Sequence, residues 1–178
     1  MNTFRIKRII KCILSIIALV ILDQLAKSWA VDKLKDTNGI DLIKGVLQFY
    51  YLPNGNTGAA FGMLQGHQSL FLFIALILSI VLLFIIYNIP NDKKYNLMIV
   101  TLTLIIAGGI GNMIDRMTLN YVIDFIYFSL INFPIFNVAD MYVSVGTIML
   151  VILFLFYYKE DDITNVEKSI KSVFIKNK

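Results

Sequence analysis

Four aspartates of this chain stand where a carboxylate is costly, beside or between long apolar runs. They are Asp23, Asp115, Asp124 and Asp140. A charge at the centre of a membrane helix costs roughly 2.5–3.5 kcal/mol on insertion scales, so such residues are kept mainly where they are paired or functional. Two carboxyl groups within hydrogen-bond distance offer one base and one acid, because like charges so close do not both ionise. Acid–base chemistry by paired carboxyl groups is therefore one function that these residues could serve.

Other polar residues accompany these aspartates at helical spacing. In each of four pairs the two residues are three or four positions apart and share one helix face: Asp23 with Lys27, Asn112 with Asp115, Asn112 with Arg116, and Asn137 with Asp140. Asp115 and Arg116 are adjacent and cannot face each other, which predicts that Arg116 neutralises a carboxylate of another element. The alternative interpretation is that all of these residues are boundary anchors and polar contacts between membrane helices.

The composition indicates a membrane protein. Of 178 residues, 58% are hydrophobic and the mean hydropathy is +0.74, whereas about 45–50% is usual for soluble domains. Four runs approach the roughly 17–25 apolar residues of a spanning helix, at residues 9–26, 70–89, 97–114 and 138–158. No small-residue cleavage site follows the first run, so we expect a retained helix. We predict an all-α membrane protein with four transmembrane helices and a small extracytoplasmic β-rich subdomain.

Basic residues predict the orientation of these spans. Lys and Arg gather before the first run, at Lys93 and Lys94, and after residue 158, and such clusters stay on the cytoplasmic side. Both termini are then cytoplasmic, residues 27–69 and 117–137 lie outside, and all four aspartates are at the outer face. Residues 46–52 and 122–128 are β-branched and aromatic and predict extended segments. We assign residues 1–160 to a membrane domain that includes the outer segment 27–69, and residues 161–178 to a polar cytoplasmic tail.

Rare residue types disfavour several functions. With one cysteine, Cys12, and one histidine in the chain, neither a disulfide nor a zinc site is expected, and we predict no metal and no cofactor. Cys12 is interpreted as a packed membrane thiol. The net charge of +4 fits membrane topology better than nucleic-acid binding. Gly108, Gly109 and Gly111 are more typical of close helix packing than of a dinucleotide site.

Two rival functions also fit membrane carboxylates. A proton-coupled transporter or channel would distribute its acids through the depth of the bilayer, whereas here they gather at one surface. A non-catalytic membrane scaffold would tolerate Asp124→Asn, which keeps the shape of the side chain and removes its charge.

Five motifs, in order along the chain, resemble the lipoprotein signal peptidases (signal peptidase II). They are DQLAK at residues 23–27, NTGAAF at 56–61, GNMIDR at 111–116, VIDF at 122–125 and FNVAD at 136–140. The resemblance implies a membrane aspartic endopeptidase that cleaves diacylglyceryl-modified prolipoproteins just before the lipidated cysteine. It further implies a bacterial cell (inner) membrane protein, sensitive to globomycin, with its site toward the extracytoplasmic face. We expect a monomer whose partners are these substrates and membrane lipid.

The resemblance also implies roles for particular residues. Asp124 and Asp140 match the catalytic pair of the family. The supporting positions are Asp23, Lys27, Asn56, Gly58, Gly108, Asn112, Asp115, Arg116, Asn137 and Ala139. Where the family usually has a glycine before its first catalytic aspartate, this chain has Asn120, which also tolerates positive φ. Asn54 and Asn56 are both candidates for the substrate contact.

Overall fold

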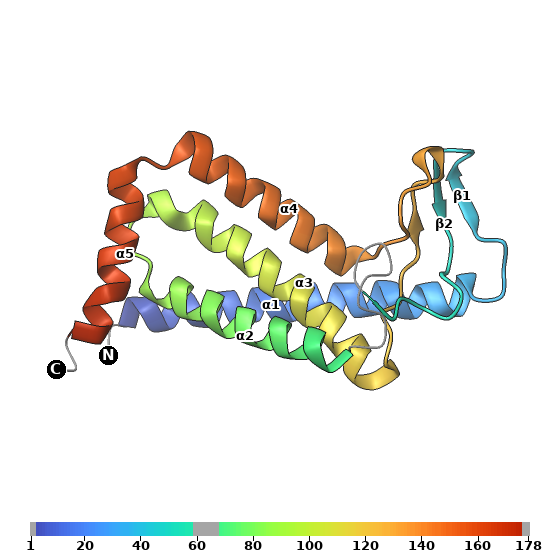
Figure 1. Cartoon of the computed structure of the whole chain (residues 1–178), viewed down its shortest axis with the longest axis horizontal. Helices are drawn as coiled ribbons and strands as arrows, with labels where there is room; N and C mark the ends of the chain where they lie inside the picture. The colour runs from blue at the N-terminus through green and yellow to red at the C-terminus, as the bar shows by residue number, and fades with distance from the viewer. Residues whose placement is uncertain (1–2, 59–67, 176–178) are drawn as a thin grey trace.

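Long helices lie side by side, and a small sheet stands at one end of them. The computed structural model describes residues 3–58 and 68–175 (Figure 1), so the last three residues of the NTGAAF motif lie outside it. The helices are α1 (Thr3–Leu34), α2 (Gln68–Asn88), α3 (Asn96–Leu119), α4 (Val138–Ile152, continued by a π-helical turn, Leu153–Tyr157) and α5 (Glu160–Ile175). Both termini lie at the end of the molecule that α5 crosses, opposite the sheet (Figure 1).

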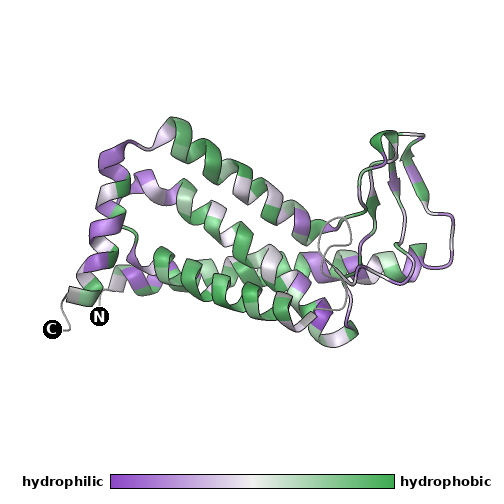
Figure 2. Ribbon diagram, in the orientation of Figure 1, coloured by the Kyte–Doolittle hydropathy of each residue, from purple (hydrophilic) through white to green (hydrophobic). Residues whose placement is uncertain are grey.

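Three helical segments of the described chain are long and apolar enough to cross a membrane. They are Thr3–Leu34, Lys93–Leu119 and Val138–Tyr157, and the apolar stretch Leu72–Asn88 of α2 is shorter. Leu14 and Phe73 are 61% and 62% exposed, and the middle of the helices is predominantly hydrophobic (Figure 2). Exposed apolar side chains of this kind suit the hydrocarbon of a bilayer. The helical backbone suits it as well, because a helix satisfies its own hydrogen bonds. The prediction of apolar spanning helices is thus confirmed for three of the four runs.

The first helix is longer than predicted. We expected it to end near residue 26, with Asp23 and Lys27 at its boundary, but α1 continues to Leu34. No proline or glycine interrupts the chain before Gly39, and Ala30 and Leu34, four positions apart, are buried in a cluster with Tyr51 and Phe125. Asp23 and Lys27 therefore lie within the helix.

Glycines allow α3 and α4 to approach closely. A Cβ on Gly108 would lie 2.3 Å from the main-chain oxygen of Ala139, and one on Gly146 would lie 2.9 Å from that of Thr101. A Cβ on Gly111 would lie 2.6 Å from Oδ2 of Asp23 on α1. The predicted packing role is confirmed at Gly108 and Gly111. At Gly109 the described residues show no such packing, because a Cβ there meets none of their atoms within 4 Å.

Two separate segments of the chain form a three-stranded antiparallel sheet in the order β1 (Ile40–Ile43), β2 (Leu47–Phe49), β3 (Ile126–Tyr127). The two extended segments that we predicted supply β2 and β3, while β1 was not predicted. Beyond β2 the pairing continues, because the main-chain N–H of Leu52 donates to the oxygen of Asp124 at 3.0 Å and Asn56 bridges Val122. This pairing fixes the backbone on either side of Asp124.

The C-terminal helix packs across the opposite end of the bundle. The Ser169 hydroxyl donates to the main-chain oxygen of Asn88 at 2.6 Å, and Lys94 pairs with Asp162 at 2.5 Å. Cys12 is buried in the apolar core at this end, as predicted.

The packing at α3 predicts that alanine substitutions at two neighbouring glycines, Gly108 and Gly109, have different effects on stability. Gly108→Ala should lower the stability by about 1–3 kcal/mol, the usual cost of overpacking, because a main-chain oxygen cannot move aside cheaply. Gly109→Ala should leave the melting temperature unchanged or raise it, because alanine is the better helix former and space is open there. Thermal unfolding in detergent micelles measures both, and equal losses would contradict the packing described.

Candidate active site

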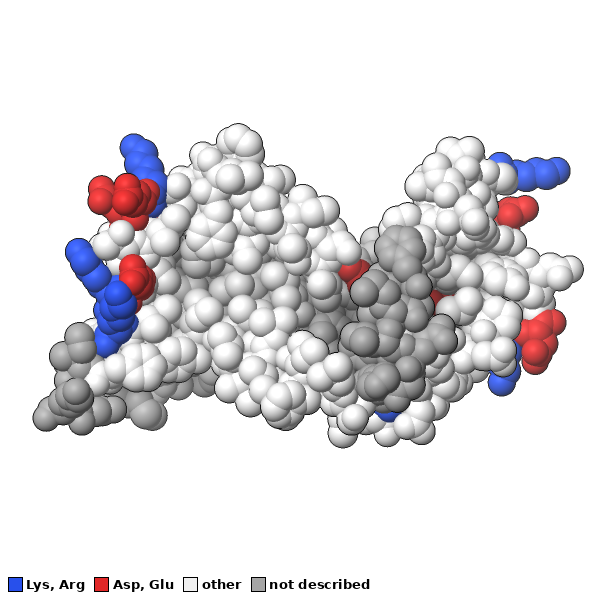
Figure 3. Space-filling view, viewed as in Figure 1, with Lys and Arg blue, Asp and Glu red and all other residues white. Residues whose placement is uncertain are grey.

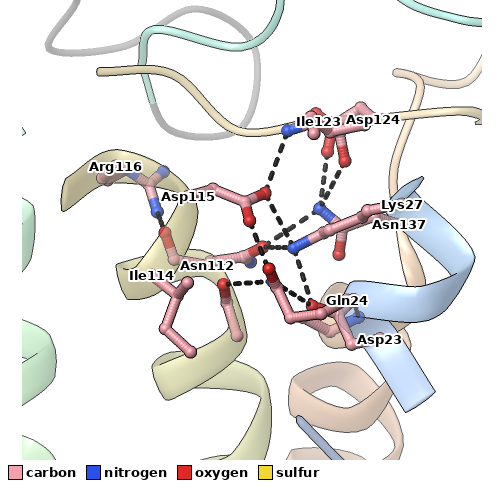
Figure 4. A network of polar contacts seen from close by, with 12 residues as sticks. Asp23, Gln24, Lys27, Asn112, Ile114, Asp115, Arg116, Ile123, Asp124 and Asn137 are labelled. Atoms are coloured by element: carbon pink, nitrogen blue, oxygen red, sulfur yellow. Dashed lines mark hydrogen bonds and ion pairs between the residues drawn. The ribbon is translucent and has the colours of Figure 1, made fainter. Parts of the chain in front are cut away.

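A network of polar side chains lies where α1, α3 and α4 meet the loop before the sheet (Figure 4). On the face shown in Figure 3, charged side chains gather at the two ends of the molecule, and acidic atoms also show in the hollow between the helices and the sheet. Hydrogen bonds and ion pairs join the members of this network across elements that are distant in the sequence. The predicted convergence of the aspartates is therefore present.

Lys27 is the cation at the base of the network. Its ammonium lies 2.8 Å from Asp23 and 3.0 Å from Asp115, and the three side chains are 2% exposed or less. The same ammonium donates to Oδ1 of Asn112 at 3.0 Å. Burying these charges is expensive, and the mutual attraction of the ions with these hydrogen bonds offsets that cost. The ion pairs join α1 to α3.

The two carboxylates on Lys27 also hold neighbouring elements through backbone hydrogen bonds. Oδ1 of Asp23 accepts from the N–H of Ala139, in the first turn of α4, at 2.9 Å. Oδ2 of Asp115 accepts from the N–H of Ile123 at 3.1 Å, which fixes the residue before Asp124.

The start of α4 connects Asp124 to Asp140. The Asn137 side chain accepts from the N–H of Asp140 at 2.9 Å, while Oδ2 of Asp140 accepts from the N–H of Asn137 at 3.1 Å. This capping box begins the helix. The side-chain amide of Asn137 also donates to Oδ1 of Asp124 at 2.6 Å. One residue thus contacts both carboxyl groups.

Asparagines complete the surroundings of the two carboxyl groups. Asn112 donates to Oδ1 of Asp140 at 2.7 Å, and its own oxygen accepts from Asn137 at 3.0 Å. Asn56 donates to Oδ2 of Asp124 at 2.9 Å. Each carboxyl therefore receives at least two hydrogen bonds, and Asn56 rather than Asn54 is the residue placed at the site.

Arg116 ties the segment around Gly58 to α3. Its guanidinium donates to the main-chain oxygen of Gly58 at 3.0 Å and to that of Asn112 at 3.4 Å. The N–H of Gly58 in turn donates to Oδ1 of Asn56 at 3.0 Å. We predicted that Arg116 neutralises a carboxylate of another element, and the charges that act on its guanidinium are those of Asp140, Asp124 and Asp115. The close ion pairs to Asp23 and Asp115 come from Lys27.

The turn after α3 accepts an asparagine in place of glycine. Asn120 has a φ of 65° and ends α3, with its N–H donating to the oxygen of Arg116 at 3.2 Å. Asparagine is among the residues that tolerate this left-handed conformation. The turn expected from the sequence is therefore formed, and it directs the chain back toward Asp124.

Asp124 has an unusual proton affinity. Its side chain is 1% exposed, and burial, followed by the neighbouring charge of Asp140, raises its pKa to about 7. The hydrogen bonds from Asn56 and Asn137 favour the ionised form and lower the pKa in part. Asp124 therefore exchanges a proton close to neutral pH, as an acid–base group requires.

The structure brings the predicted site residues together and adds one. Gly108 packs on Ala139, and the other predicted supporting residues join the hydrogen-bonded network directly. Gln24 was missed: its amide donates to Oδ1 of Asp115 at 2.9 Å and to the oxygen of Gly111 at 3.2 Å. Its position inside the DQLAK motif was the available signal. Among the described residues, no three His, Cys, Asp or Glu side chains gather as ligands for a metal ion.

The fold and the site define a multi-pass membrane protein in which two carboxyl groups, each held by asparagine residues, lie where the helices meet a small sheet. The sequence profile of a family described as "Signal peptidase (SPase) II" matches residues 15–156. The chain belongs to the signal peptidase II family.

Relatives and a solved structure agree with this membership. The chain is 43% identical over 152 residues to a lipoprotein signal peptidase of Clostridium tetani, covering 84% of this chain and 93% of the relative. It is 40% identical over 145 residues to that of Clostridioides difficile, covering 82% and 95%. A bacterial membrane enzyme solved by the in meso method at 2.3 Å is 33% identical, with a TM-score of 0.73 over 84% of this chain and 92% of that one.

The buried ion pairs predict that Lys27 is essential for stability. Lys27→Met leaves Asp23 and Asp115 without their cation, and breaking a buried pair typically costs about 3–5 kcal/mol. The matched control is Lys33→Met, because Lys33 and Asp32 also pair at 2.8 Å on the same helix but are 60% and 69% exposed. Thermal unfolding in micelles should show a large loss for Lys27→Met and none for Lys33→Met. Similar melting temperatures for the two variants would contradict this role.

Proposed function

We propose that this chain is an aspartic endopeptidase that removes the signal peptide from diacylglyceryl-modified prolipoproteins, cleaving before the lipidated cysteine. The observation that carries the proposal is the bridge at Asn137, whose side-chain amide donates to Asp124 at 2.6 Å and whose main-chain N–H donates to Asp140 at 3.1 Å. Membership in the signal peptidase II family supports the same reaction. A proton relay would spread its acids through the membrane depth, whereas these acids meet in one network.

The proposed reaction is the addition of water to the scissile peptide. One carboxylate of the pair takes a proton from a water molecule, and the water oxygen attacks the carbonyl carbon while the protonated partner donates to the carbonyl oxygen. A proton then passes to the peptide nitrogen, the C–N bond breaks, and a carboxylic acid and an amine result. Asn56, Asn112 and Asn137 orient the two carboxyl groups, and the pair titrates as a unit.

The arrangement also supports a position in the membrane. The N-terminal helix begins with Arg5, Lys7 and Lys11 at the end of the molecule that holds both termini (Figure 1). The pair Asp124 and Asp140, the dyad, lies toward the sheet, because Asp124 precedes β3 by two residues and Asp140 is in the first turn of α4. By the positive-inside rule we infer that the termini are cytoplasmic and that the site faces the extracytoplasmic side. At 1.5 Å per residue, the 21 residues of α2 reach about 30 Å, so we assign α2 as the fourth span.

The proposal also covers the domain boundaries, the oligomeric state, the cofactor requirement and the inhibitor. Residues 1–160 form the peptidase domain, residues 161–178 form a cytoplasmic tail, and the enzyme works as a monomer without a cofactor. Its substrates reach it through membrane lipid, because the diacylglyceryl group remains in the bilayer. Globomycin is expected to inhibit it, as the family resemblance implies.

Removing either carboxylate should abolish cleavage. Asp124→Asn and Asp140→Asn keep the shape of the side chain but cannot share a proton, so cleavage of a lipidated prolipoprotein should fall by at least a factor of 100, the lower end for acid–base catalysis. Cleavage is followed with purified enzyme in micelles, and Asp32→Asn, at the exposed Lys33 pair, is the control. Wild type that leaves the substrate intact, or either variant cutting at the wild-type rate, would refute the proposal.

The pH dependence should report Asp124. Above a pKa of about 7 the pair loses its shared proton, so kcat/KM should decline on the alkaline side of neutrality. Asn56→Ala removes a hydrogen bond that favours the ionised form, so the alkaline limb should move to higher pH. Gln48→Ala, which loses only a hydrogen bond to Asn38, should leave the limb in place. A limb that moves down or stays put in Asn56→Ala is inconsistent with Asp124 as the titrating group.

A further inference from the structure

An apolar groove between α2, α3 and α4 reaches the polar network. Its volume is about 230 Å³, and Ile74, Ala75 and Leu78 of α2 line it together with residues of α3 and α4. In Figure 1, α2 and α4 lie on either side of α3. Its polar end is formed by Asn112, which donates to Asp140, and by Arg116. A ligand in the groove would therefore contact Asn112, a residue that is hydrogen-bonded to Asp140 of the dyad.

Gly109 leaves the α3 wall of this groove open. It lines the groove, and an added Cβ would meet no described atom within 4 Å. At Gly108 and Gly111, by contrast, a Cβ would come within 2.3 Å and 2.6 Å of oxygen atoms on other elements. Helix packing among the described residues therefore accounts for those two glycines and not for Gly109. Since glycine weakens a helix interior relative to alanine, the open space needs another explanation.

We propose that Gly109 sets the width of the groove, and that the groove holds an acyl chain of the diacylglyceryl group on the substrate cysteine. This inference rests on the proposed function. A volume of about 230 Å³ is below the roughly 300–1,000 Å³ of pockets for drug-sized ligands, so it suits a single narrow chain. Ile74 and Leu78 are 51% and 46% exposed, which opens the groove to hydrocarbon. A cysteine at the dyad then places its lipid within reach.

The length of the acyl chain is the variable that tests this inference. The full-length enzyme in micelles is given synthetic prolipoprotein peptides whose cysteine carries either two octanoyl or two palmitoyl chains, and the ratio of kcat/KM for the long to the short lipid is measured. Each methylene that leaves an apolar site changes kcat/KM by about fourfold, equivalent to about 0.8 kcal/mol. Gly109→Leu fills the groove from α3, so the ratio should fall at least tenfold.

Two further variants separate the groove from general effects on folding. Ala75→Leu fills the same groove from α2 and should also lower the ratio. Leu76→Phe adds bulk to α2 at a side chain that is 50% exposed and outside the groove lining, and it should leave the ratio unchanged.

The outcomes distinguish the inference from the function on which it rests. An unchanged ratio in both groove variants overturns the inference while the proposed function stands, because wild type still cuts; a groove that holds a bilayer phospholipid gives this result. Equal loss on both peptides, or the same fall in Leu76→Phe, also overturns it. Wild type that cuts neither peptide overturns the proposed function, and the inference with it.

Discussion

A lysine ammonium held in an apolar interior organises this protein. Lys27 lies within 3.0 Å of a carboxylate on its own helix and of one on α3. Neither acid is stable there without the cation, and the cation is not stable without the acids, because each buried charge alone carries a large desolvation cost. Asp23 extends the arrangement to the first turn of α4, and Asp115 extends it to the loop at Ile123. Moving any one of these elements would therefore break charged hydrogen bonds in a medium without water to replace them.

The dyad builds on this framework through an ordinary device of helix structure. A capping box begins α4 and uses the side chains of Asn137 and Asp140 reciprocally. The spare amide hydrogens of Asn137 reach Asp124, Asn112 and the oxygen of Ile123. The helix start thus orients one carboxyl group while contacting the other. The Asn137 side chain accepts a hydrogen bond from the backbone of α4 and also donates one to Asp124. Small shifts of α4 would therefore disturb both the helix cap and the site.

The three-stranded sheet and the pairing beyond it limit where Asp124 can lie. Strand-like pairing of Leu52 with Asp124 and of Asn56 with Val122 leaves the loop little freedom, and the edge-to-face contact of Trp29 with Phe49, 5.3 Å between ring centroids, fixes the sheet on the extension of α1. The unexpectedly long first helix therefore contributes to both parts of the structure. Trp29, in its last turns, packs on the sheet, and Asp23 and Lys27 supply charges to the polar network. Apolar helices and a small sheet meet at the site.

The sequence by itself determined the class of protein, the apolar segments and the set of polar residues at the site. Hydropathy and residue spacing are local properties, so they indicated α3, α4 and the three- and four-residue pairings within helices, and family motifs marked the aspartates of the dyad. Tertiary structure alone decided the partners. Lys27 and Asp115 are far apart in the chain, and nothing local indicates that this lysine, rather than Arg116, forms the ion pair with Asp115. Gln24 joined the site only because α1 packs on α3, where its amide reaches Asp115 and Gly111. Likewise, Gly108 and Gly109 look alike in sequence, and only the packing of α4 against one of them makes that position crowded and the other open.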